Sequence, residues 1–342
     1  MSTVLDIAQL LFGIAILYWG AEWLIRGSAA LARAFGVKPL VIGLTVVAYG
    51  TSAPELAVAT KTALVHSQPI ALGTVIGSCA ANISLILGLT ALIAPPTVDG
   101  RIIRREVPVL VGSAIAVPIL FRNGVLSQLE GALLVLCAII FTIVTLTVSA
   151  RLDPDAADAD DDFDPNASSS AALASVRSAE ESGVHIGGGG RPRATRGASA
   201  LMSLVGLVLL VTGSSLFVKG GRSLAAEVNM SDRMLGLTVI SIGCALPELI
   251  GSVVAATRGH SALAVGSVIG SNLLNVFLVL GVTAYLGEIR LGERMHVIDL
   301  LGLVAITLLG VLMLRGSRRI SRLEGGILVG AYVAFIVATA IW

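Results

Sequence analysis

Long apolar runs recur along the chain and predict membrane-spanning helices. Leu, Ile, Val, Ala and Gly fill these runs without the apolar/polar alternation of a membrane β-barrel. A helix needs about 20 apolar residues to cross a bilayer core of ~30 Å. Ten runs reach or approach that length: 4–25, 39–64, 70–94, 107–121, 127–149, 198–218, 234–257, 262–286, 296–314 and 323–341. The pattern therefore predicts an all-α polytopic membrane protein.

The apolar pattern breaks once, at residues 151–196. There RLDPDAADADDDFDPNASSS leads into a small-residue stretch and then GGGGRPRATR. A segment this polar cannot bury enough apolar surface to pack a core. We therefore expect a disordered acidic linker at 151–196, between one unit at 1–150 and a second at 197–342.

The acidic linker contains a spacing that is typical of a calcium-binding loop. Four aspartates alternate as the first EF-hand ligands do: Asp158, Asp160, Asp162 and Asp164. However, Phe163 occupies the position of the turn glycine, and Ser169 that of the bidentate glutamate. A solvated acidic tract is therefore the favoured interpretation, with a calcium sensor as the alternative.

The two units repeat each other at a constant offset of 193 from Gly13 to Ala91. GLTVVAYGTSAPEL matches GLTVISIGCALPEL at eight of 14 positions, and GTVIGSCAANISLILGLTA matches GSVIGSNLLNVFLVLGVTA at 11 of 19. Each unit holds five apolar runs, and an odd number of crossings inverts the second copy. The sequence thus predicts ten transmembrane helices arranged as two inverted five-helix repeats, as in many secondary transporters.

Two smaller patterns also recur in both units. SQLEG at 127–131 and SRLEG at 321–325 read as capping boxes that open the fifth helix of each repeat. Glycines recur every seven residues in the first helix of each repeat: Gly13, Gly20 and Gly27, then Gly206, Gly213 and Gly220. Close helix packing is the favoured interpretation of these stripes, and a sliding face is the alternative.

Composition supports the membrane assignment. Apolar residues make up 55% of the chain and charged residues 13%, with a mean hydropathy of +0.92, far from the roughly 25% charged residues of a soluble domain. Cys79, Cys137 and Cys244 all fall inside apolar runs, so we expect neither a disulfide framework nor a thiolate metal site. The net charge of +1 identifies no partner, and we expect contact with lipid rather than nucleic acid.

The distribution of Lys and Arg predicts an orientation. The loops after the first, third, fifth, seventh and ninth runs hold 16 of the 23 basic residues. The richer face should be cytoplasmic. We therefore expect a multi-pass protein of the cell membrane, with both termini outside and residues 151–196 in the cytoplasm.

Two acidic residues stand at membrane depth, Glu55 in GTSAPEL and Glu248 in GCALPEL. A carboxylate there costs ~2.5–3.5 kcal/mol on insertion scales. No Lys or Arg lies within two helical turns of Glu248, and Lys61 is the nearest to Glu55. An ion-binding site is therefore favoured over a structural salt bridge.

The residues before each glutamate suggest how such a site is built. Pro54 and Pro247 cannot donate to the carbonyls of Gly50 and Gly243, which predicts a break in each helix. Freed carbonyls at midplane can be satisfied by a bound cation. Thr51 and Ser52 lie one turn before Glu55 on the same face.

Polar residues recur in the next helix of each repeat. Ser78 and Asn82 lie one turn apart in GSCAAN, as do Ser271 and Asn275 in GSNLLN. They suit a hard cation with oxygen ligands, and together with both glutamates and nearby carbonyls they could reach the six to eight oxygens that Ca²⁺ prefers. The alternative is interhelical hydrogen bonding by these side chains.

These paired motifs resemble the α-1 and α-2 repeats of the cation/calcium antiporter superfamily, especially its prokaryotic sodium/calcium exchangers. The resemblance covers all ten runs. It implies one site region shared by Ca²⁺ and Na⁺ and reached alternately from each side, with no cofactor and a monomeric transport unit. It also implies that Glu55 and Glu248 bind Ca²⁺ with backbone carbonyls, while hydroxyls and amides complete sodium sites. The implied further ligands are Ala48, Thr51, Ser52, Ser78, Asn82, Ser241, Cys244, Ser271 and Asn275.

The second motif departs from the family pattern G-T-S-x-P-E. Cys244 and Ala245 replace the two hydroxyl residues, and a thiol is a poor ligand for a hard cation. The Cys244 carbonyl remains. We therefore predict that calcium binding survives, while sodium coupling is weakened, altered or replaced by protons.

We accordingly expect a secondary active antiporter that exchanges Ca²⁺ for Na⁺, with a proton-coupled divalent-cation exchanger as the alternative. A cation channel is a different class, against which the inverted repeats argue. An enzyme is not expected, because no paired nucleophile or cofactor motif accompanies the two acids.

Overall fold

The computed structural model describes residues 2–35, 48–65, 67–98, 100–152, 196–257, 261–291, 297–316 and 319–341. In the first repeat the helices are α1 (Ser2–Ala34), α3 (Ala48–Thr51), α4 (Ala53–Leu64), α5 (Gln68–Ala80), π-helix η2 (Ala81–Ile86), α6 (Leu87–Ile93), α7 (Gly100–Leu120) and α8 (Gln128–Leu152). In the second they are α10 (Arg196–Glu227), α11 (Asp232–Leu235), π-helix η5 (Gly236–Ile240), α12 (Ser241–Thr257), α13 (Ser261–Leu274), π-helix η6 (Asn275–Leu280), α14 (Gly281–Leu286), α15 (Val297–Gly316) and α16 (Arg322–Ile341).

The predicted all-helical membrane fold is confirmed. Within the described residues, eight helical spans are long and apolar enough to cross a membrane. Two predicted runs fall outside that set. The run at 39–64 is described only from residue 48, as α3 and α4, and the run at 107–121 lies in α7, whose first turns carry several charges. Most of the predicted linker, 153–195, lies outside the described residues.

The two repeats are related by an inverted pseudo-two-fold axis at the centre of the bundle. Asn272 of α13 donates its side-chain amide to the Cys79 carbonyl of α5 at 3.2 Å, and the Cys79 thiol lies 3.8 Å from the Asn272 carbonyl. These residues are 193 positions apart, so they occupy the same place in the two repeats. The third helix of each repeat therefore crosses its own counterpart on the axis.

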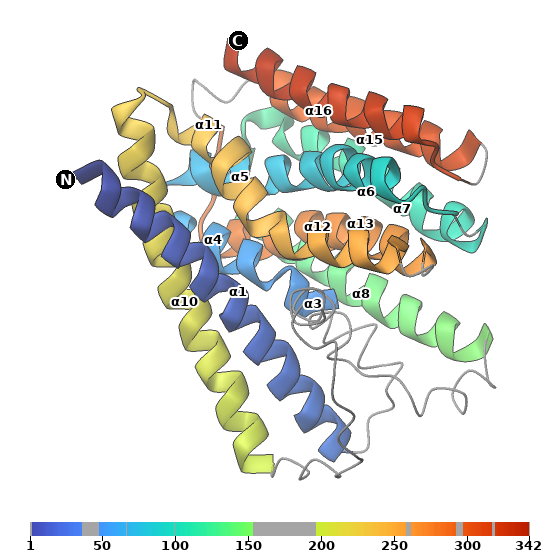
Figure 1. Ribbon diagram of the computed structural model, residues 1–342, viewed down its shortest axis with the longest axis horizontal. Helices are drawn as coiled ribbons and strands as arrows, with labels where there is room; N and C mark the ends of the chain where they lie inside the picture. The colour runs from blue at the N-terminus through green and yellow to red at the C-terminus, as the bar shows by residue number, and fades with distance from the viewer. Residues whose placement is uncertain are drawn as a thin grey trace, which may run out of the picture.

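The periphery follows the same symmetry. Helix α8 packs against α14 and η6, and α16 packs against α6 and η2, on opposite flanks (Figure 1). The close crossings lie at Gly131 with Gly281 and at Gly325 with Gly88, where an added Cβ would meet a backbone carbonyl at 2.8–3.0 Å. Strands β1 (Val125–Leu126) and β2 (Ile289–Arg290) pair antiparallel. The bridge from Thr97 to Arg319 is their counterpart.

Helices α1 and α10 lie along each other at one side of the bundle (Figure 1), and the glycine stripes face one another. A Cβ on Gly20 would lie 2.8 Å from the Leu210 nitrogen, and one on Gly213 would lie 2.8 Å from the Leu17 nitrogen. The two backbones are therefore in direct contact, which confirms close small-residue packing.

Capping and one ion pair fix the ends of several helices. The Ser127 nitrogen donates to Glu130 at 2.8 Å and the Glu130 nitrogen to the Ser127 hydroxyl at 3.3 Å, so this predicted capping box is confirmed. The same reciprocal pair forms at residues 321 and 324. Arg233 of α11 and Asp299 of α15 form a buried bidentate pair at 2.6 Å, which the sequence did not predict.

The stripe contact predicts the effect of a single methyl group. Gly20→Ala should destabilise the protein by about 1–3 kcal/mol, because the backbone of Leu210 must move to admit it. The matched control is Gly112→Ala in α7, where an added Cβ meets nothing within 4 Å. Thermal unfolding in detergent should show a lower midpoint for Gly20→Ala alone. Equal midpoints for the two variants would contradict the packing described.

Candidate cation site

Glu55 lies where the second helix is interrupted. Helix α3 ends at Thr51, α4 begins at Ala53, and Ser52 between them has φ −84° and ψ 3°. Pro54 and Glu55 stand in the first turn of α4, and Glu55 is 1% exposed. The predicted break is therefore confirmed in the first repeat. It places the carboxylate at the positive end of α4's macrodipole.

The second repeat positions its glutamate differently. Helix α12 continues from Ser241 to Thr257 through Pro247, so the predicted break at GCALPEL was wrong. A proline removes only one backbone hydrogen bond, and here the irregularity lies in the π-helix η5 that precedes α12. Glu248 still faces inward and is 2% exposed.

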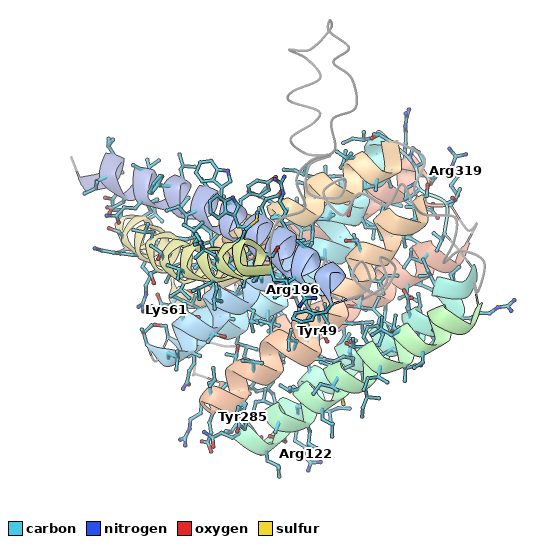
Figure 2. The ribbon with its side chains drawn as sticks, turned by 90° about the horizontal axis from the view of Figure 1, so that it is seen from below. Tyr49, Lys61, Arg122, Arg196, Tyr285 and Arg319 are labelled. Atoms are coloured by element: carbon cyan, nitrogen blue, oxygen red, sulfur yellow. The ribbon has the colours of Figure 1, made fainter. Side chains whose placement is uncertain are left out.

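The two carboxylates are unsatisfied and close to each other. None of their four oxygens has a hydrogen-bond partner among the described residues, and they are near enough to repel each other electrostatically. Lys61, the nearest cation in the sequence, lies at the periphery (Figure 2). Buried charges in proteins are normally paired or bound to a metal. This pair therefore fits a cation.

Asn82 and Asn275 complete a second unsatisfied pair. Each lies at the start of a π-helix, η2 or η6, and neither is more than 1% exposed. Within the described chain, no atom of either amide group makes a hydrogen bond. The interhelical hydrogen bonds considered from the sequence are therefore not made by these two residues. Interhelical hydrogen bonds are made instead by Asn272, on the axis, and by Ser78, which donates to the Ser241 carbonyl.

The predicted hydroxyl ligands differ in how free they are. Ser52 is buried, and its hydroxyl neither caps α4 nor finds another partner in the described structure. Ser78 lies 3.5 Å from the Ser241 carbonyl. The Ser241 hydroxyl bonds the Leu237 carbonyl at 2.7 Å. Ser271 faces Glu248. Ser52 therefore stays a predicted ligand whose hydroxyl is free of hydrogen bonds within the described residues.

The remaining predicted residues are placed as follows. Thr51 is half-buried at the end of α3, and Ala48 begins the same helix. The Cys244 thiol is buried close to both carboxylates. Ala245 is also buried, and neither residue offers a hydroxyl. At the two motif positions compared here, the first repeat therefore carries the hydroxyls of Thr51 and Ser52, and the second carries a thiol and a methyl group.

Four buried polar residues were missed from the sequence. Tyr332 of α16 is buried facing Ser241, and its counterpart in the first repeat is Ala138. Asn272 lies on the axis, and Ser252 and Thr90 carry buried hydroxyls with no partner in the described structure. A search for polar residues shared by the two repeats misses three of the four, because their counterparts in the other repeat are apolar or carry a different side chain. Thr90 shares its identity with Thr283 but not its bonding.

The unsatisfied carboxylates predict a trade-off between stability and ion binding. Glu55→Gln should raise the free energy of unfolding of the ion-free protein by about 1–3 kcal/mol, because it removes one of two facing buried charges. Added Ca²⁺ should stabilise the wild type but not this variant. Glu288→Gln, at a partly exposed loop residue, is the control and should change neither quantity. A destabilised Glu55→Gln that still responds to Ca²⁺ would contradict the assignment.

Comparison with known proteins agrees with this geometry. The sodium/calcium exchanger protein family matches residues 5–147 and 198–341. The putative antiporter CaxA of Alkalimonas amylolytica is 33% identical over 329 residues, 95% of both chains. The sodium/calcium exchanger MaX1 of Methanosarcina acetivorans is 30% identical over 352 residues, 96% of both.

Solved structures lead to the same family. The sodium-calcium exchanger NCX_Mj, soaked with Na⁺ and Ca²⁺, superposes with a TM-score of 0.63 at 28% identity, covering 98% of each chain. The inner membrane protein YrbG of Escherichia coli is 29% identical over 335 residues, 97% of this chain and 96% of its own. These matches confirm the resemblance drawn from the paired motifs. They also confirm that the chain belongs among transporters rather than enzymes. The chain belongs to the sodium/calcium exchanger protein family.

Proposed function

We propose that this protein is a secondary active antiporter that exchanges Ca²⁺ for Na⁺ across the cell membrane by alternating access. The observation that carries the proposal is the pair of buried, unpartnered carboxylates, Glu55 and Glu248, at equivalent positions of two inverted repeats. Two negative charges are balanced by one Ca²⁺ or by two Na⁺. Competition for the same charges would couple the two fluxes.

The ligands available favour a hard divalent cation. Glu55 and Glu248 supply up to four oxygens and the amides of Asn82 and Asn275 two more, with backbone carbonyls near Thr51 and Cys244 in addition. This reaches the six to eight oxygens that Ca²⁺ takes. Among the described residues, no cluster of three or more His, Cys, Asp or Glu side chains offers a softer site.

Alternating access requires that the occupied carrier reorients more easily than the empty one. Without a cation, two unpaired carboxylates would have to be enclosed in an apolar environment between the two open states, which is costly. A bound ion removes that charge. The glycine stripes join α1 to α10 along their length, so the two helices can move as one unit against the bundle that holds the glutamates. In this proposal the site stays fixed while α1 and α10 open one face at a time.

A proton-coupled exchanger is the second candidate, and one observation favours it. Thr51 and Ser52 precede Glu55, whereas Cys244 and Ala245 precede Glu248, so the second repeat lacks both hydroxyl ligands. The Cys244 thiol beside the carboxylates is a poor substitute for Na⁺. Two carboxylates could instead exchange one Ca²⁺ for two protons. Calcium binding itself would be unaffected.

The orientation of the protein is part of the proposal. The excess of Lys and Arg in loops on one face supports a cytoplasmic location for residues 151–196 and an outside location for both termini. With that orientation, an inward Na⁺ or proton gradient would drive Ca²⁺ out of the cell.

Radioactive Ca²⁺ uptake into proteoliposomes tests the function. An outward Na⁺ gradient should drive uptake, and Glu248→Gln should reduce it to background because a carboxylate is lost.

An outward proton gradient in separate vesicles tests the second candidate. The double variant Cys244→Thr/Ala245→Ser should lower the Na⁺ concentration needed for half-maximal rate. Uptake under neither gradient, or Ca²⁺ flux without countertransport, would contradict an antiporter.

A further inference from the structure

We propose that a pocket between the α6–α7 connection and the α15–α16 connection binds the phosphate of an anionic phospholipid headgroup. The pocket measures about 600 Å³ and is lined by Pro95, Arg319, Ser321 and Arg322. None of these residues belongs to the candidate cation site. The proposal therefore goes beyond the transport function and does not depend on it.

Backbone hydrogen bonds hold the two connections together and shape the pocket. Thr97 and Arg319 form an antiparallel bridge, and the Ile320 nitrogen donates to the Pro96 carbonyl at 3.0 Å. Pro96 and Ile320 are buried, whereas the side chains of Thr97 and Arg319 are exposed. The turn that carries Arg319 is therefore fixed from within, and its guanidinium group faces outward.

Positive charge predominates around the pocket. Arg315 lies in the last turn of α15, and it is exposed, as are Arg319 and Arg322. Among the described residues, the acid next to the pocket in the chain is Glu324, which accepts hydrogen bonds from the Ser321 nitrogen and hydroxyl at 2.7 and 2.8 Å. The pocket therefore fits an anion. Two guanidinium groups suit a phosphate in particular, because its oxygens accept bidentate hydrogen bonds.

The pocket lies at the level where lipid headgroups are expected. The apolar span Gln68–Ile93 ends beside it, and the span Arg322–Ile341 begins there. Apolar side chains give way to charged ones at this point, as they do at a membrane–water interface. Basic pockets between transmembrane helices at the cytoplasmic level are typical sites for anionic headgroups. In the proposed orientation, this is the cytoplasmic face.

Exposed apolar side chains next to the arginines favour a lipid over free phosphate. Leu323 is 77% exposed, and Leu92 and Ile93 are exposed as well. Helix α16 touches the end of α6 here, because a Cβ on Gly325 would lie 3.1 Å from the Leu92 nitrogen. A lipid whose headgroup fills the pocket could lay its acyl chains on these side chains. Free phosphate would use the arginines alone.

The symmetric turn at the opposite face lacks these arginines. The counterparts of Arg319 and Arg322 in the first repeat are Val125 and Gln128, where strands β1 and β2 make the equivalent backbone pairing. The fold therefore forms this turn without arginine. A positive-inside bias would account for basic residues on one face, but it does not require them to line a pocket beside apolar side chains.

Lipid-dependent thermal stability of the purified protein in mixed micelles tests the site. Phosphatidylglycerol should raise the unfolding midpoint, whereas phosphatidylcholine and inorganic phosphate at the same concentration should not. Arg319→Gln and Arg322→Gln should each raise the phosphatidylglycerol mole fraction for half-maximal stabilisation about 5-fold. The matched control is Arg122→Gln. Arg122 is exposed beyond the other end of α7, well away from Arg319 (Figure 2), and its loss should change nothing.

Equal lipid dependence of the wild type and the Arg319→Gln/Arg322→Gln double variant would overturn the proposal. Equal stabilisation by phosphatidylcholine would also overturn it, because the headgroup charge would then not be recognised. Inorganic phosphate that stabilises as strongly as phosphatidylglycerol would overturn the choice of a lipid. If the double variant does not fold, the single variants decide against Arg122→Gln: a 5-fold shift supports the pocket, and no shift overturns it.

Discussion

The structure depends on one constraint, the burial of two carboxylates that have no protein partner. An apolar helical bundle is a poor solvent for charge, and neither Glu55 nor Glu248 receives a hydrogen bond or a cation from the described residues. The amides of Asn82 and Asn275, on π-helices that pack against α12 and α4, are also left unsatisfied. Buried, unpaired charges of this kind are tolerated in a protein where a bound ligand compensates for their cost. The unmet bonds therefore favour a hard cation of matching charge as the ligand, which is the basis of the proposed function.

Inverted symmetry brings the two glutamates together, and the side chains that break this symmetry make the two halves of the site different. The axis at Cys79 and Asn272 makes each motif face its copy, as expected for one shared site. Side chains then differ between the repeats: Thr51 and Ser52 correspond to Cys244 and Ala245. We attribute the predicted change in sodium coupling to these differences. The proposed calcium position, which would use the carboxylates present in both repeats, should be less affected by them.

Much of the fold could be predicted from the sequence, because it follows from local and repeated signals. Apolar runs, the offset of 193 and the capping boxes identified the helices and their inversion. The continuous helix through Pro247 and the three π-helices could not be predicted, since they depend on packing by neighbouring helices. The Arg233–Asp299 pair and the free hydroxyls of Ser252 and Thr90 were missed for a related reason. Their roles depend on which residues pack next to them, and no repeated motif in the sequence identifies these positions.

The most direct test of the account is the number of Ca²⁺ ions that the purified protein binds at equilibrium. The account predicts one ion per chain, held jointly by Glu55 and Glu248. Glu55→Gln and Glu248→Gln should then each abolish binding, because neither carboxylate alone balances a divalent charge. Binding that persists in the double variant, or two independent ions of which each variant loses one, would contradict a shared site.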